Sequence, residues 1–159
     1  MFFIRILFIV VFSISAAIAA GSGSSGGSGS SAGDGNSYGE EFNKDLALII
    51  KDIKKEEFES AIKKLEVFVY ENPQNADGWN YIGFVSRKLM KYDDAERYYA
   101  YGLEINPKHI GILEYLGELY LETDRLDEAK ANLSILDDLC NFNCIERNKL
   151  RDLINEKLN

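Results

Sequence analysis

The chain has 159 residues, of which 26 are Asp or Glu and 18 are Lys or Arg, giving a formal net charge of −8 at pH 7. This length and a hydrophobic content of 46% allow one folded domain with appended segments. Because an acidic surface repels phosphate backbones and anionic lipid, we expect neither nucleic acid nor a membrane surface as a partner of that domain.

Residues 1–19 are expected to form a signal peptide. One cation, Arg5, precedes an apolar run of about 15 residues, which is shorter than the roughly 20 residues that a membrane-spanning helix needs. Ala17, Ile18 and Ala19 supply an A-x-A cleavage site. We therefore expect the domain to be exported and to be periplasmic or secreted. An uncleaved anchor is the alternative, and it would also export the domain.

Residues 20–39 consist mainly of Gly and Ser and show no periodicity. Such a composition cannot offset the entropy of ordering by burial, so a flexible linker is expected between the signal and a domain at 40–159. Two interpretations of the linker stay open. It is either a spacer that frees the domain from another surface or a neutral low-complexity insertion.

Residues 76–109 carry the most specific pattern in the chain. Six residues match the offsets of a 34-residue helix-turn-helix unit with the pattern W-x2-L-G-x2-Y, A-x3-F, P. They are Trp79, Ile82, Gly83, Ala95, Tyr99 and Pro107. Ser86 stands where the pattern has Tyr, and Gly102 stands where Ala is usual. The stretch resembles a tetratricopeptide repeat.

A shift of 34 positions aligns Ala61, Ala95 and Ala129, and it also aligns Pro73 with Pro107. Three repeats follow, near 42–75, 76–109 and 110–143. Residues 145–158 have one apolar face and suit a helix that caps the open end of a stack. The predicted fold is all-α with seven helices. The resemblance implies three helical hairpins stacked as a short right-handed solenoid, followed by the capping helix.

Local signals predict where several helices begin and end. Asp93 and Glu96 suggest a capping box at the second helix of the middle repeat. Asn72-Pro73 and Asn106-Pro107 are expected to end the second helices of the first two repeats, because Pro disfavours a helical conformation in the residue before it.

Cys140 and Cys144 form a C-x3-C sequence, and Cys140 aligns with Asn72 and Asn106. In an exported protein an even number of cysteines favours a disulfide, here one that holds the turn before the capping helix. Thiol-disulfide redox chemistry stays open as an alternative. Metal binding is not expected, because about four ligands are needed and only His109 joins the two cysteines.

The resemblance implies that the first helix of each repeat lines a concave groove and that fixed positions point into it. These positions hold Leu46, Ile50, Ile53 and Lys54 in the first repeat; Asn80, Tyr81, Phe84, Arg87 and Lys88 in the second; and Glu114, Tyr115, Glu118 and Glu122 in the third. The groove would thus change from apolar through aromatic and basic to acidic.

Two interpretations of these positions compete. Tyr81, Phe84 and Tyr115 are interpreted as a contact surface, because aromatic residues often carry binding energy. The three glutamates are interpreted as a solvated helix face paired with Arg87 and Lys88, and the apolar residues of the first repeat could be ordinary packing. The carboxylate-binding residues of chaperone-binding relatives are absent. Their positions hold Leu46, Ile50, Tyr81, Gly111 and Tyr115.

No catalytic constellation or phosphate-binding loop is readable, and His109 is expected to be an exposed turn residue. The predicted function is a non-catalytic protein-interaction module without a cofactor, which binds a peptide or protein with an apolar end and a basic end. It would act as an adaptor or assembly scaffold in the cell envelope. The chain also resembles short exported bacterial repeat proteins with a C-x3-C turn. A redox role for Cys140 and Cys144, or self-association through the apolar first repeat, are the alternatives.

Overall fold

A computed structural model describes residues 44–159, and the expected signal peptide, linker and residues 40–43 lie outside the described residues. The described part contains seven helices and no strand, which confirms the predicted all-α class. None of these helices is long and apolar enough to cross a membrane. The helices are α1 (Lys44–Lys54), α2 (Phe58–Glu71), α3 (Ala76–Lys88), α4 (Tyr92–Ile105), α5 (Ile110–Glu122), α6 (Leu126–Leu139) and α7 (Ile145–Leu158).

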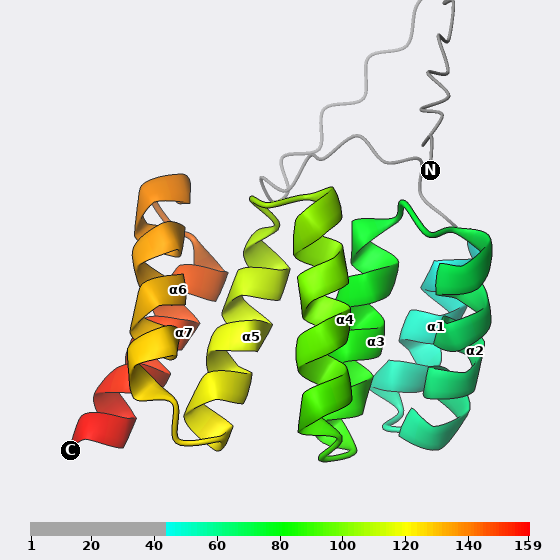
Figure 1. Cartoon of the computed structure of the whole chain (residues 1–159), viewed down its shortest axis with the longest axis horizontal. Coiled ribbons are helices and arrows are strands. Elements are labelled where there is room, and N and C mark those ends of the chain that lie inside the picture. The colour runs from blue at the N-terminus through cyan, green and yellow to red at the C-terminus, as the bar shows by residue number, and fades with distance from the viewer. Residues whose placement is uncertain (1–43) are drawn as a thin grey trace, which may run out of the picture. The chain divides into compact units, whose positions relative to one another are not determined.

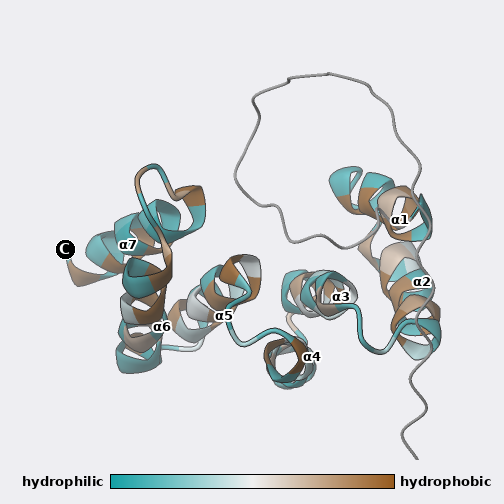
Figure 2. Ribbon diagram, turned by 90° about the horizontal axis from the view of Figure 1, so that it is seen from above, coloured by the Kyte–Doolittle hydropathy of each residue, from teal (hydrophilic) through white to brown (hydrophobic). Residues whose placement is uncertain are grey.

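Successive helices form antiparallel hairpins, α1 with α2, α3 with α4 and α5 with α6, and the hairpins stand side by side (Figure 1). Viewed from above, α3 and α4 form the middle hairpin, with α5 and α6 on one side and α1 and α2 on the other (Figure 2). The last helix, α7, packs against α5 and α6. The described residues therefore form the predicted stack of three hairpins with a terminal helix.

Small residues at the aligned positions let the helices approach closely. Ala61, Ala95 and Ala129 are fully buried, one in each hairpin. A Cβ atom on Gly83 would lie only 2.5 Å from the ring of Tyr99, so glycine is required where α3 meets α4. The small residues that recur every 34 positions in the sequence are thus the residues at which the two helices of each hairpin meet.

His109 is not the exposed turn residue that the sequence suggested. Its side chain caps α5, because Nδ1 accepts a hydrogen bond from the backbone N–H of Ile112 at 3.1 Å. The Nε2 atom then carries the proton and donates to Asp77 Oδ1 at 2.9 Å. The residue is 8% exposed and joins the start of α3 to the start of α5.

The predicted capping box at α4 is wrong. The helix begins at Tyr92, its N-cap is Lys91, and no side chain caps it. Asp93 lies in the first turn, where a carboxylate interacts favourably with the helix dipole. Glu96 instead accepts a hydrogen bond from Arg125 Nη1 at 2.7 Å and links the second hairpin to the third.

Cys140 and Cys144 form the predicted disulfide. Cys140 is the C-cap of α6, as Asn72 is of α2 and Asn106 is of α4, and Cys144 is the N-cap of α7. The bond therefore joins the end of the third hairpin to the start of the terminal helix. Arg147 also holds this turn, with Nη1 donating to the carbonyl oxygen of Cys140 at 3.4 Å.

Candidate functional site

The predicted groove residues differ widely in how much of each side chain is accessible. Those that are exposed or half-buried are Ile50, Lys54, Tyr81, Phe84, Lys88, Tyr115 and Glu122. Those that are buried are Leu46, Ile53, Asn80, Arg87, Glu114 and Glu118. Helical position alone therefore does not decide which residues a partner can contact.

The first repeat contributes mainly core to the molecule. Leu46 and Ile53 are buried in the cluster that joins α1 to α2 and α3, and Ile50 is partly buried against the same cluster. For Leu46 and Ile53 the packing interpretation is thus the correct one, since their side chains are not accessible. Of the apolar residues in this part of the groove, Ile50 keeps accessible surface.

Three half-buried aromatic side chains, Tyr81, Phe84 and Tyr115, form what we call the aromatic patch. The rings of Phe84 and Tyr115 lie 5.0 Å apart between centroids, and Phe58 contacts Phe84 edge to face at 6.5 Å. Burial raises the pKa of the Tyr81 and Tyr115 phenols, so both remain neutral and can donate hydrogen bonds near neutral pH. The contact between Phe84 and Tyr115 joins α3 to α5.

Arg87 lies under the aromatic patch. Its side chain is almost fully buried, and its guanidinium pairs with Glu118 at 2.7 Å and with Glu122 at 2.5 Å. The guanidinium carbon lies 5.7 Å from the ring centroids of both Phe84 and Tyr115. The expected pairing of the glutamates with Arg87 is present, and it anchors α3 to α5.

Lys149 of α7 enters the same region from the C-terminal side. Its Nζ lies 2.7 Å from Glu114 and 2.7 Å from Glu118, and 5.4 Å from the ring centroid of Tyr115. With Arg87, Glu114, Glu118 and Glu122 it forms what we call the charge network. Sequence reasoning missed Lys149, because nothing in the sequence indicates that a lysine on the polar side of the terminal helix contacts glutamates of α5.

Glu114 and Glu118 are buried and so do not belong to the solvated stripe that the sequence suggested, whereas Glu122 is exposed. Burial raises the pKa of Glu114 to about 7, an effect that exceeds the lowering by Lys149. Glu118 is also buried, but hydrogen bonding to Lys149 and the charges of Arg87 and Lys149 together hold its pKa below the usual value. Glu118 is therefore the carboxylate that carries charge at acidic pH, while Glu114 retains its proton.

Next to the charge network, a hollow of about 470 Å³ lies between α5 and α7. Leu121 and Leu153 contribute apolar surface, and Glu118, Glu122 and Glu156 contribute carboxylates. Lys157 also borders the hollow, but its Nζ is bound to Asp124 at 2.6 Å and to the carbonyl oxygen of Leu121. We call it the acidic hollow.

Comparisons with known proteins support the repeat assignment. A family model described as tetratricopeptide repeat matches residues 89–138. A search of the curated proteins found no match. The fold is that of tetratricopeptide-type helical solenoids, as the solved structures show.

The translocator chaperone SycD of type III secretion from Yersinia enterocolitica has a TM-score of 0.65 at 18% identity, covering 72% of this chain and 81% of that one. PcrH in complex with the chaperone-binding region of PopD also has a TM-score of 0.65, at 15% identity, with 72% and 89% covered. The first repeat domain of Spaghetti (RPAP3), bound to the HSP90 peptide SRMEEVD, has a TM-score of 0.62 at 21% identity, with 73% and 94% covered. At these identities the likeness establishes the fold alone.

Proposed function

We propose that this chain is a non-catalytic, exported module that binds a peptide or an exposed helix of another protein in its groove. The ligand would place an apolar or aromatic side chain on the aromatic patch and a Lys or Arg in the acidic hollow. The observation that carries the proposal is that half-exposed Phe84 and Tyr115 lie in contact beside a hollow bordered by three carboxylates.

The energetics favour the aromatic patch as the principal contact. Aromatic residues fixed by neighbours cost little entropy when they bind, and they are enriched among residues that dominate interfaces. Phe84 and Tyr115 are already held by each other and by Arg87, so their surface is organised before a ligand arrives. The acidic hollow would then fix the direction of the ligand through charge complementarity.

The similar structures support a peptide or a protein segment as the ligand. PcrH is seen with a segment of PopD, and the Spaghetti domain with a seven-residue peptide. Binding of a peptide or protein segment therefore has a precedent among structures of this fold. The expected signal peptide and the Cys140–Cys144 disulfide support a role in an oxidising compartment, as an adaptor or assembly scaffold of the cell envelope.

Selection from a displayed library of random twelve-residue peptides tests the proposal. We expect wild-type protein to enrich sequences that pair an aromatic or aliphatic residue with Lys or Arg. The enriched peptides should lose at least about ten-fold in affinity for Phe84→Ala/Tyr115→Ala, which corresponds to about 1.4 kcal/mol. Enrichment of acidic peptides, or unchanged affinity for the double variant, would contradict the groove assignment.

A matched control uses Tyr70 of α2, which is 86% exposed and lies outside the predicted groove positions. Tyr70→Ala removes a similar aromatic surface and should leave the affinity of the selected peptides unchanged. Glu156→Gln then tests the acidic hollow separately, because Glu156 borders it without taking part in the charge network. Its effect should be confined to peptides that contain Lys or Arg.

A further inference from the structure

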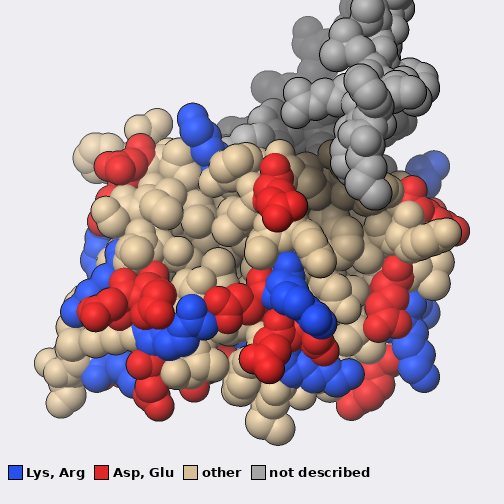
Figure 3. All heavy atoms as spheres, viewed as in Figure 1, with Lys and Arg blue, Asp and Glu red and all other residues tan. Residues whose placement is uncertain are grey.

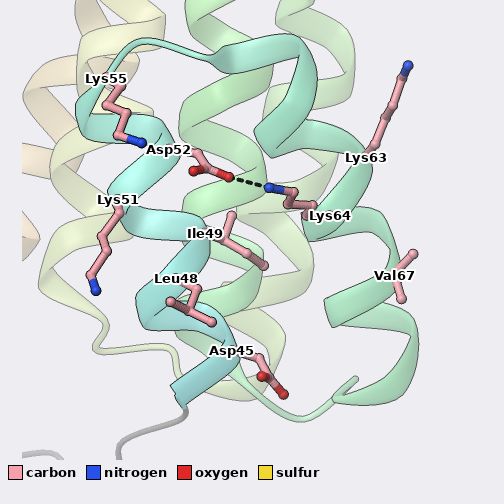
Figure 4. A pocket seen from close by; sticks show the side chains of 9 residues that line it. All are labelled: Asp45, Leu48, Ile49, Lys51, Asp52, Lys55, Lys63, Lys64 and Val67. Carbon is pink, nitrogen blue, oxygen red and sulfur yellow. Dashed lines mark hydrogen bonds and ion pairs between the residues drawn. The ribbon is translucent and has the colours of Figure 1, made fainter.

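A second hollow, of about 710 Å³, lies at the opposite end of the described stack, between α1 and α2. Leu48 and Val67, which are 58% and 57% exposed, contribute apolar surface to it. Lys51 extends from α1, Lys55 extends from the turn that follows α1, and Lys63 and Lys64 extend from α2, around this surface (Figure 4). We call it the lysine hollow.

The charges of the lysine hollow are unusual for this chain, whose net charge is −8. Lys64 is bound to Asp52 at 2.5 Å. Two carboxylates, Asp45 and Asp52, also line the hollow, so four lysines there face two aspartates. On the face where α4 lies, by contrast, cations and anions alternate (Figure 3), as in the Arg125 pairs with Glu96 and Glu128. The hollow thus combines exposed apolar side chains with four lysines and two aspartates, an excess of two positive charges (4 − 2) among its lining residues.

The other end of the stack has the complementary chemistry. On α7, Ile145 is 72% exposed, and Ile145, Asp152, Leu153 and Glu156 line a hollow of about 390 Å³. Positions 145, 152 and 156 are seven and four residues apart and so lie on one side of the helix. Lys149 borders the same hollow, but its charge is used by Glu114 and Glu118. The outer side of α7 therefore presents apolar surface with two carboxylates.

We propose that the lysine hollow of one molecule receives the outer side of α7 from a second molecule. Apolar Leu48 and Val67 would meet Ile145, while Lys51, Lys55 and Lys63 would face Asp152 and Glu156. This contact joins two different surfaces, so a pair of molecules still has one free lysine hollow and one free α7 surface. It is a head-to-tail contact, so it extends into a chain of molecules or closes into a ring. The proposed contact does not involve the aromatic patch or the carboxylates of the charge network. It shares Glu156 with the acidic hollow.

Sedimentation of the exported chain, residues 20–159, over roughly two decades of concentration tests the proposal. The weight-average mass should rise to at least about twice the monomer mass, and the rise should weaken as NaCl goes from about 0.05 to 0.5 M. Leu48→Gln/Val67→Gln and Ile145→Gln/Asp152→Asn should each weaken self-association by at least about ten-fold. All four side chains lie at the surface, and circular dichroism confirms that the variants remain folded.

Mixing the two variants distinguishes a head-to-tail contact from any other. The first variant keeps an intact α7 surface and the second keeps an intact lysine hollow, so an equimolar mixture should form pairs of about twice the monomer mass and nothing larger. Three results would overturn the proposal. They are a wild-type chain that stays monomeric, association that survives both pairs of substitutions, and a mixture that stays monomeric.

Discussion

The aromatic patch and the charge network lie next to each other on the same helices, yet they differ in what they leave for a partner. Phe84, Tyr81 and Tyr115 keep accessible surface, whereas Arg87, Glu114 and Glu118 are buried and paired within the chain. Residues at equivalent repeat positions therefore have different roles. The charge network holds α3, α5 and α7 together, and the aromatic patch is the surface that this framework presents.

The largest loss of stability is expected when Arg87, the central residue of the charge network, is replaced. Arg87→Met removes the partner of two carboxylates and leaves Glu118 buried with Lys149 alone, so unfolding should become easier by about 3–5 kcal/mol. Lys88→Met, one residue further along α3 and exposed, should change stability by no more than about 1 kcal/mol. Urea denaturation of both variants gives the two values. An equal loss of stability in the two variants would mean that the buried ion pairs of Arg87 stabilise the fold no more than the exposed Lys88 does.

The pH dependence of stability is the next largest effect. The pKa of Glu114 is about 7 in the folded chain and 4.5 in the reference state. The folded state therefore holds a proton that the unfolded state releases between these values. This stability is fully present below pH 4.5 and is lost as the pH rises through 7, by about 1–3 kcal/mol.

Glu114→Gln isolates that contribution, because the amide does not titrate. Urea denaturation at pH 5 and at pH 8 should show a larger fall in stability for wild type than for the variant. The same fall in both proteins would show that Glu114 does not keep its proton and that the charge network is ionised throughout.

The disulfide should have a smaller effect than Arg87, because it fixes the turn before α7 and not the groove. Cys140→Ser/Cys144→Ser should cost about 2 kcal/mol, as expected when so short a loop is no longer closed in the unfolded chain. Wild type in reducing agent should match the variant. Thermal unfolding measures the stability of the variant and of reduced wild type. A loss of peptide binding without a loss of stability would instead favour a direct role of the cysteines in function.

The sequence predicted the features that depend on residues repeated every 34 positions. Ala61, Ala95 and Ala129 marked the closely packed hairpins, and Asn72, Asn106 and Cys140 marked equivalent helix ends. Those signals are local or periodic, so they can be read without knowing which helices touch.

The features that the sequence could not predict are contacts between side chains far apart in the chain. Lys149 reaches Glu114 across 35 positions, and His109 reaches Asp77 across 32. Glu96 seemed suited to a capping box, but it binds Arg125 of the next hairpin. For the same reason the burial of Arg87 was not foreseen, and the sequence left open whether Leu46 packs in the core, because burial depends on neighbours that the pattern does not specify.

The smallest change in stability and the largest change in binding should come from the aromatic patch. Phe84→Ala/Tyr115→Ala removes half-exposed rings, so the fold should persist while the contact surface disappears. The most direct measurement is the calorimetric affinity of one library-selected peptide for wild type, for this double variant and for Tyr70→Ala. The proposed function predicts a loss of at least about ten-fold for the double variant alone. Equal affinities in all three proteins would contradict it.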